Sequence, residues 1–399
     1  MFLDVLRRRN PRLIEAAIRL HQERVLPANS YVIDVDAVEG NARAIRAAAD
    51  RHGLKVFAMT KQMGRNASFC QAVKRGGIGE AVVVDMECAR ACHRAGLAIG
   101  HVGHLVQVPR AEADAAARLE PRYWTVFNDE KAGEAGAALK AAAGSGRLLA
   151  RIQAEGDVFY IGHEGGFPAA DILAVADRID RIADGRFAGI TTFPAQLFDA
   201  KTRRIKPTPN TTTLKRAADA LAKAGRKDIE INAPGTTSAA VIPALAEVGA
   251  TQCEPGHGLT GTSPLHAVED LPELPSVVYL SEVSHLHGGR AYCFGGGLYI
   301  DPVFPDYDLK AVVAREPTSA ASALRSVEIP PPAAIDYYGM IDASGPEAAR
   351  PGDSVVFGFR PQAFVTRAYV VGVSGLAKGK PKVEAIHDAT GRAVAWPVG

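Results

Sequence analysis

The chain has 399 residues, of which 47% are hydrophobic and 23% charged, and its formal net charge is +2. This composition is typical of a folded globular protein. Because the charge is near neutral and no basic stripe stands out, we expect no nucleic-acid partner. No run of about 18 apolar residues predicts a membrane span. The most basic stretch, 201–206, indicates a solvated loop.

Residues 1–27 predict an N-terminal helical arm that ends at Pro27. The basic residues Arg7-Arg8-Arg9 are not followed by the apolar stretch of a secretory signal. The number of cysteines, five, is odd, so they cannot all pair in disulfides within the chain. This favours reduced thiols and a cytoplasmic protein. Cys88 and Cys92 lie four apart on an expected helix, where a place in the core is expected rather than a metal site.

Between residues 28 and 270, short apolar runs alternate with Ala-rich segments of helical period, and many of these segments end at a glycine. The expected strands are 55–61, 80–85, 101–108, 123–128, 148–153, 187–193, 228–233 and 251–254. Eight strands separated by helices predict an α/β fold, a (β/α)₈ TIM-like barrel. A doubly wound open sheet is the alternative.

The pattern changes near residue 271, where prolines interrupt the chain and alternating segments replace the helical ones. The segments 276–284, 289–294 and 354–373 read as strands. Residues 271–399 therefore predict a separate C-terminal β domain.

Lys61 ends the first expected barrel strand, an apolar run in which a charged side chain is unusual. A lysine at this place can form an imine with an aldehyde cofactor. The alternative is a lysine that simply emerges at the end of a strand.

Two further strand ends carry groups that suit the same kind of cofactor. Gly235-Thr236-Thr237-Ser238 precedes an expected helix near residue 238, where N–H groups and hydroxyls suit a phosphate, although an ordinary N-cap has the same pattern. Glu254 ends the last strand beside Gly256 and His257, whose turn offers further N–H groups. Glu254 is suited to bind a heteroaromatic nitrogen, or else is a solvated carboxylate.

The segment Tyr31-Val32-Ile33-Asp34-Val35-Asp36-Ala37-Val38, the Lys61 strand and the segment from Glu254 to Pro264 resemble the alanine-racemase-like, fold-type-III enzymes, and within them the YhfX-like subgroup. The resemblance implies that Lys61 carries pyridoxal 5′-phosphate as a Schiff base. It implies that Arg65 stands near the place of a phosphate-contacting tyrosine of alanine racemases. It also implies a homodimer whose active site is shared between subunits.

Glu254-Pro255-Gly256 departs from the Arg-Pro-Gly of alanine racemases and resembles the decarboxylases of this fold. A carboxylate keeps the pyridine nitrogen of the cofactor protonated, which makes the ring a stronger electron sink. The departure therefore opens racemisation, decarboxylation and retro-aldol cleavage to this site.

The resemblance further implies a second acid/base in the segment 290–297, with Tyr292 as first choice and Cys293 as second. Some aldolases and dehydratases of this fold bind a metal in the β domain. His285, His287 and Cys293 are possible ligands, but their spacing is not a fixed zinc pattern and we predict no metal.

We expect an enzyme that acts at the α-carbon of an amino acid, with racemase or epimerase first. A decarboxylase, or a D-amino-acid aldolase or dehydratase, is the alternative within the fold. From another class, a pyridoxal-phosphate-binding homeostasis protein without robust catalysis is the alternative, which the presence of a β domain disfavours.

Overall fold

The computed structural model describes residues 1–299, 301–317, 323–344 and 348–397. Its contacts divide the chain into two units. The barrel unit comprises Ala42–Thr60 and Val73–Gly258, and the β unit comprises Met1–Asn41, Lys61–Ala72 and Leu259–Gly399. This division differs from the expected barrel of residues 28–270, because residues 28–41, 61–72 and 259–270 belong to the β unit.

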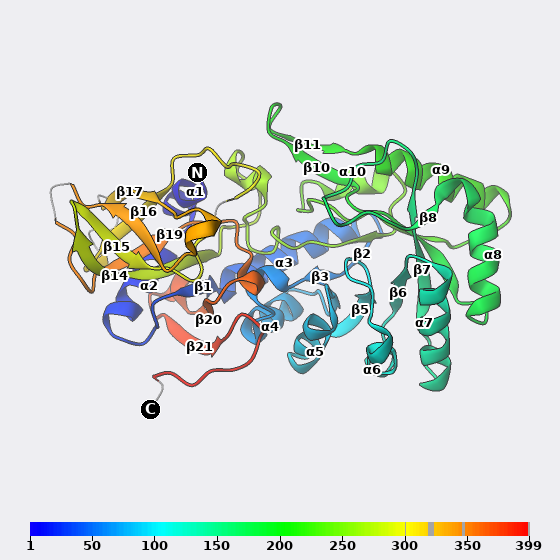
Figure 1. Ribbon diagram of the computed structural model, residues 1–399, viewed down its shortest axis with the longest axis horizontal. Helices are drawn as coiled ribbons and strands as arrows, with labels where there is room; N and C mark the ends of the chain where they lie inside the picture. The colour runs from blue at the N-terminus through cyan, green and yellow to red at the C-terminus, as the bar shows by residue number, and fades with distance from the viewer. Residues whose placement is uncertain (300, 318–322, 345–347, 398–399) are drawn as a thin grey trace. The chain divides into compact units, whose positions relative to one another are not determined.

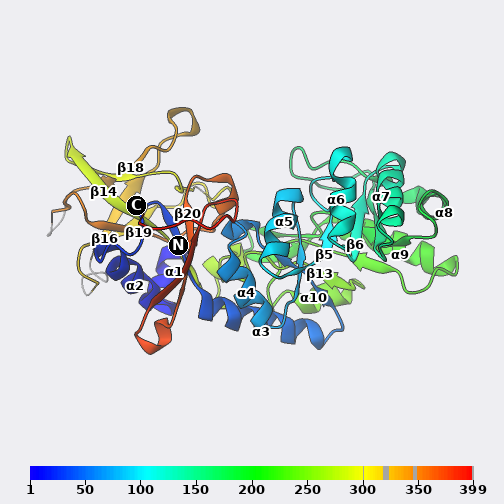
Figure 2. The ribbon, with the colours of Figure 1, turned by 90° about the horizontal axis from the view of Figure 1, so that it is seen from below.

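The barrel unit is a ring of parallel strands with helices along its outside (Figures 1 and 2). Its strands are β2 (Lys55–Val56), β3 (Ala58–Met59), β4 (Glu80–Val82), β5 (Ala98–Val102), β6 (Tyr123–Val126), β7 (Arg147–Gln153), β9 (Phe187–Thr191), β12 (Glu230–Asn232) and β13 (Gln252–Cys253). β2 pairs with β13 and β3 pairs with β4, so the extended run 55–59 closes the ring. With β2 and β3 as one strand, the described barrel has the eight strand positions that the sequence predicted.

Helices follow the strands as the alternating pattern indicated. They are α3 (Val35–Asp50), α4 (Ala67–Arg75), α5 (Met86–Arg94), α6 (Ala113–Arg118), α7 (Asp129–Ala141), α8 (Ile172–Ile182), α9 (Pro209–Lys223) and α10 (Ile242–Glu247). Cys88 and Cys92 of α5 are buried near the Thr60 hydroxyl, as expected for core cysteines. Among the described residues, every helix is too short or too polar to cross a membrane.

Two short pieces of sheet were not expected. β8 (Phe167–Pro168) pairs with the end of β7, and β10 (Gln196–Asp199) forms a hairpin with β11 (Arg204–Pro207). The basic stretch 201–206 forms the turn and part of the second strand of this hairpin. It is largely exposed, as expected, and Lys206 pairs with Asp199 at 2.6 Å.

The β unit contains a closed ring of antiparallel strands in the order β14, β15, β18, β17, β16 and β19, which returns to β14. β1 pairs with β14 on one side and β20 on the other, and β21 follows β20. The strands are β1 (Ser30–Asp34), β14 (Val277–His287), β15 (Arg290–Phe294), β16 (Lys310–Ala314), β17 (Leu324–Glu328), β18 (Tyr338–Asp342), β19 (Ser354–Phe357), β20 (Tyr369–Ser374) and β21 (Lys382–His387).

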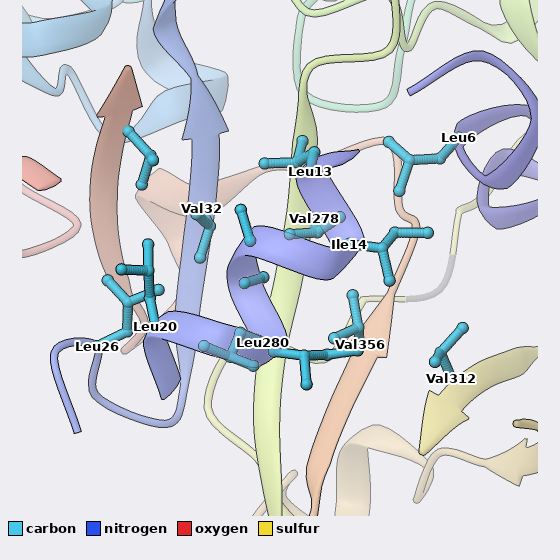
Figure 3. Packing of buried hydrophobic residues seen from close by; sticks show 14 of the residues in the cluster. Leu6, Leu13, Ile14, Leu20, Leu26, Val32, Val278, Leu280, Val312 and Val356 are labelled. Carbon is cyan, nitrogen blue, oxygen red and sulfur yellow. The ribbon is translucent and has the colours of Figure 1, made fainter. Parts of the chain in front are cut away.

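The N-terminal arm consists of two helices, α1 (Phe2–Arg9) and α2 (Pro11–Gln22). Pro11 begins α2, since the first turn of a helix does not need its missing N–H. Leu13 and Ile14 of α2 pack against Val278 and Val356 of the sheet (Figure 3). The arm is thus part of the hydrophobic core of the β unit.

Candidate active site

Lys61 lies two residues beyond β3, at the end of the strand as predicted, and begins a 3₁₀ turn, η1 (Lys61–Met63). Its Nζ lies 4.8 Å from the centroid of the Phe364 ring, and the Arg65 guanidinium lies 5.6 Å from the same centroid. A cation over an aromatic face is held by the ring's quadrupole. The side chain of the predicted cofactor lysine therefore has a defined place within the β unit.

The backbone after Lys61 is fixed closely to the end of the β unit. Gly64 has a φ of +55°, and a Cβ on it would lie 3.1 Å from the Ala389 carbonyl oxygen, so a side chain fits poorly there. Asn66 donates from Nδ2 to the Val370 carbonyl at 2.9 Å. Arg65 is buried and donates from Nη1 to Ala389 O at 3.4 Å. Its role toward a phosphate stays a prediction.

Glu254 directly follows β13 and is buried in the barrel interior. Its Oε1 accepts a hydrogen bond from Asn232 Nδ2 at 2.9 Å and contacts His101 Nδ1 at 2.8 Å. Its Oε2 lies 3.4 Å from His104 Nε2. Glu254 is therefore not the solvated carboxylate that the sequence left as an alternative.

His101 and His104 were missed by the sequence reasoning as site residues. His101 lies in β5, and its Nε2 is 2.6 Å from Thr125 Oγ1, so Glu254 and Thr125 fix both sides of the imidazole. His104 follows Gly103, whose φ of +75° turns the chain at the end of the strand. The sequence did contain a signal for these two residues. His101 and His104 lie three apart, with Gly103 between them, within the run 101–108 that was expected to be a strand.

Burial and neighbours determine the charge of this cluster. Burial raises the pKa of the Glu254 carboxyl, but the two imidazoles and the Asn232 amide outweigh burial and leave the pKa below its ordinary value. Burial also lowers the pKa of His104 to about 3, which the attraction of Glu254 only partly counteracts. At neutral pH the cluster therefore contains a carboxylate anion beside an uncharged His104.

His104 makes the stability of the protein depend on pH. Its pKa is lowered from 6.5 to about 3 by folding, so only the unfolded chain gains a proton here below pH 6.5. The stability due to neutral His104 is complete above pH 6.5 and is lost as pH falls toward 3, by at most about 1.4 kcal/mol per pH unit. We expect His104→Phe to flatten the fall in urea-unfolding free energy between pH 7 and 5. His93→Phe, on the exposed face of α5, is the control, and equal slopes in the two variants would contradict the assignment.

The turn 235–238 differs from its prediction in one respect. The helix begins at Ile242 rather than near 238, because Pro243 has to lie in the first turn. Thr236 N–H donates to Gln196 O at 3.2 Å, so it is already engaged. The Ser238 hydroxyl is buried and has no hydrogen-bond partner among the described residues, which leaves it able to bind an added group.

Gly235, Thr237, Gly256 and His257 are the remaining predicted phosphate contacts. Thr237 donates from Oγ1 to Gly235 O at 3.2 Å. A Cβ on Gly258 would lie 2.4 Å from Thr237 O, so the turn 256–258 packs closely against the turn 235–238. Within the barrel unit, the two turns that the sequence assigned to one phosphate are therefore adjacent. Their contact with a phosphate stays a prediction.

Tyr292 and Cys293 face opposite sides of β15. Tyr292 is half-buried on the outer side, where its ring stacks on His285 with centroids 4.6 Å apart. Cys293 is fully buried, and burial raises the pKa of its thiol to about 11. The burial and raised pKa of the Cys293 thiol favour Tyr292 over Cys293, and the role of either residue as the second acid/base stays a prediction.

The histidines considered as β-domain metal ligands are not joined by Cys293. His285 is opposite Tyr292 and His287 is opposite Arg290, whereas Cys293 is opposite Val283 and buried. The group of possible metal ligands found among the described residues is instead His101, His104 and Glu254, in the barrel unit.

Comparison with known proteins gives the family. The alanine racemase N-terminal domain family matches residues 33–264, and the YhfX-like C-terminal domain family matches residues 278–383. The chain is 35% identical to the uncharacterized protein YhfX of Escherichia coli (strain K12) over 394 residues. The match covers 99% of this chain and 100% of that protein.

Solved structures share the fold at low sequence identity. D-threonine aldolase from Filomicrobium marinum has a TM-score of 0.65 and 18% identity, and the match covers 92% of this chain and 96% of that one. Alanine racemase of Clostridium difficile 630 has a TM-score of 0.65 and 13% identity, covering 92% and 99%. D-threo-3-hydroxyaspartate dehydratase from Delftia sp. HT23 has a TM-score of 0.63 and 16% identity, covering 90% and 97%. The chain thus belongs to the alanine racemase N-terminal domain family, in the group that carries the YhfX-like C-terminal domain.

Proposed function

We propose that this protein is a pyridoxal-phosphate-dependent enzyme that acts at the α-carbon of an amino acid, as a racemase or epimerase. The observation that carries the proposal is the Glu254 carboxyl group, which is buried in the barrel interior and accepts a hydrogen bond from Asn232 Nδ2. Glu254 ends the segment that pairs with the strand 55–59, and Lys61 follows this strand by two residues. Along the chain, Lys61 and Glu254 thus follow two segments that pair with each other in the barrel unit.

The residues present fit the cofactor. Its phosphate needs hydrogen-bond donors, and the buried Ser238 hydroxyl has no partner among the described residues. Its ring nitrogen needs an acceptor that stays ionised, and the lowered pKa of Glu254 supplies one. We therefore assign Lys61 to the aldehyde carbon, Glu254 to the ring nitrogen, and the turns at 235–238 and 256–257 to the phosphate. Arg65 is a further proposed phosphate contact.

The cofactor, when bound, withdraws electrons from the α-carbon of the amino acid and so makes its proton acidic. Lys61 takes or returns this proton on one face. Tyr292 of the partner subunit serves the other face, which makes the proposed assembly a homodimer. Tyr292 is preferred to Cys293 because its side chain is partly exposed, whereas the thiol is buried in the core.

Glu254 also favours a second candidate reaction within the same chemistry. A carboxylate that keeps the ring nitrogen protonated stabilises negative charge at the α-carbon for longer than an arginine does. Decarboxylation, aldol cleavage and elimination of water are then open as well. A homeostasis protein without catalysis is disfavoured, since the β unit with Tyr292 has no evident role in a carrier.

Proton exchange with solvent separates these functions. The cofactor-loaded protein is incubated with L- and D-amino acids in deuterated water, and the amino acids are recovered for mass spectrometry and chiral analysis. A racemase introduces deuterium at the α-carbon and produces both enantiomers. Release of CO₂, or of an aldehyde or keto acid, with unchanged recovered substrate favours the second candidate. If no amino acid exchanges or reacts, the proposal of an enzyme is wrong.

A further inference from the structure

Two histidines and one glutamate come together inside the barrel unit, at the carboxyl ends of two strands. His101 lies near the end of β5, His104 follows this strand by two residues, and Glu254 directly follows β13. Their side chains are 0%, 1% and 3% exposed. One imidazole nitrogen from each histidine and one carboxylate oxygen all lie within 4.8 Å of one another. Neutral imidazoles and carboxylates are ligands that zinc takes in proteins, so this group has the composition of a zinc site.

His104 is the member of this group whose burial is least explained by its contacts. Both of its ring nitrogens are buried and have no hydrogen-bond partner among the described residues. Its Nε2 lies 3.4 Å from Glu254 Oε2, which is long for a hydrogen bond. Two ligand atoms bound tetrahedrally to one zinc ion, each at about 2.1 Å, are roughly 3.4 Å apart. The spacing of His104 and Glu254 therefore suits a shared metal ion better than a hydrogen bond.

Thr125 allows His101 to offer a nitrogen to the same ion. His101 Nδ1 lies 2.8 Å from Glu254 Oε1, and its Nε2 lies 2.6 Å from Thr125 Oγ1. A hydroxyl can donate or accept, so Thr125 can hold either tautomer of the neutral imidazole. With the proton on Nε2, His101 donates to Thr125 and has a lone pair on Nδ1 for a metal, which is the usual arrangement of a ligating histidine. Asn232 donates to Glu254 Oε1 at 2.9 Å and so orients the carboxylate.

We propose that the cofactor-free chain binds one zinc ion through His101, His104 and Glu254, and that zinc and the cofactor exclude each other, because both need the Glu254 carboxylate. Three protein ligands leave the fourth position of a tetrahedral zinc ion to water. The mutual exclusion rests on the proposed function, whereas the zinc site does not. No spacing pattern in the sequence predicts this site, because Glu254 lies far along the chain from the two histidines.

The first test measures zinc binding by the full chain after hydroxylamine has removed any cofactor, by calorimetric titration. We expect one zinc ion per chain with a Kd of about 1 μM or lower, and no comparable binding of Mg²⁺, which takes oxygen ligands. His104→Gln should weaken zinc binding roughly 100-fold, and Thr125→Val, which removes only the support of a ligand, about 10-fold. The matched control is His93→Gln, an exposed histidine of α5, which should bind zinc like the natural chain.

A second variant and a spectrum keep this test decisive if His104→Gln does not fold. Glu254→Gln retains an acceptor for Asn232 but loses the charged oxygen that binds zinc, so it should also bind zinc weakly. Cobalt(II) in place of zinc should give the visible bands of a tetrahedral site without a charge-transfer band from cysteine sulfur. If the natural chain binds no zinc, or if both variants bind it as tightly as the natural chain, the zinc site is wrong.

The second test asks whether zinc excludes the cofactor. One equivalent of zinc is added before pyridoxal phosphate, and the absorbance of the lysine-bound cofactor is followed. Zinc should slow cofactor uptake about 10-fold or more in the natural chain and in His93→Gln, and a chelator should reverse this. In His104→Gln, uptake with and without zinc should be equal.

The outcomes separate the two claims. Uptake that is unaffected by bound zinc would overturn the mutual exclusion. If the natural chain takes up no cofactor even without zinc, the proposed function fails, while the calorimetric titration still shows whether the zinc site exists.

Discussion

Replacing Lys61 by alanine is expected to abolish cofactor attachment and to reduce α-proton exchange by roughly 1,000-fold or more, because a nucleophile and a proton-transfer group are lost together. The Lys61 ammonium lies over the Phe364 ring, and an alanine at this position keeps the backbone hydrogen bond from Gly64 N–H to the carbonyl of residue 61. The variant should therefore fold. The measurement is exchange in deuterated water, together with the visible absorbance band of the lysine-bound cofactor.

The control for this variant is Lys74→Ala on the nearby helix α4. Lys74 is exposed and donates to the Gly96 carbonyl at 2.7 Å, so its loss should leave both cofactor attachment and exchange unchanged. Added methylamine that restores part of the exchange in Lys61→Ala would support a direct role in proton transfer. Undiminished exchange in Lys61→Ala would rule out the assigned role.

Replacing Glu254 by glutamine is expected to reduce the rate of the reaction by about 100-fold, while the cofactor remains attached to Lys61. Glutamine keeps the size of the side chain and an acceptor for the Asn232 amide, but it removes the negative charge that holds a proton on the ring nitrogen. The lost charge should also change the pH dependence of the cofactor absorbance. Both are measured on the same cofactor-loaded sample.

Glu230→Gln is the matched control, since Glu230 is another buried carboxylate of the same barrel. It accepts hydrogen bonds from Lys55 at 2.8 Å and Tyr123 at 2.6 Å, within the barrel packing rather than the Glu254 cluster. We expect it to lower the stability of the protein and to leave the absorbance of the bound cofactor unchanged. Equal spectral changes in the two variants would show that Glu254 does not act on the ring.

The barrel could be predicted from sequence because each of its strands is a local apolar run followed by a helical segment. The first strand of the chain could not be placed in the same way. β1 is buried on both faces, as a barrel strand is, yet it pairs with β14 and β20, with Tyr31 opposite Tyr279 and Val370. Pairing between strands this far apart in the chain does not change the local pattern of apolar and polar residues. Residues 28–41 were therefore assigned to the barrel.

The site was predictable where one residue at a strand end suggested chemistry by itself, as at Lys61 and Glu254. His101 and His104 were missed because their importance depends on neighbours. His101 gains a role only through Glu254 on another strand. The burial of Cys293 was likewise not predictable from the sequence, because it depends on the pairing of β15 with β14 and β18.

The central claim is that Lys61 forms the covalent link to pyridoxal phosphate. The most direct measurement is borohydride reduction of the purified, cofactor-supplemented protein, followed by proteolysis and mass spectrometry of the peptides. We expect the reduced cofactor on the peptide that contains Lys61, and on no peptide of the Lys61→Ala variant. A reduced cofactor on a different lysine, or none in the natural chain, would contradict the claim.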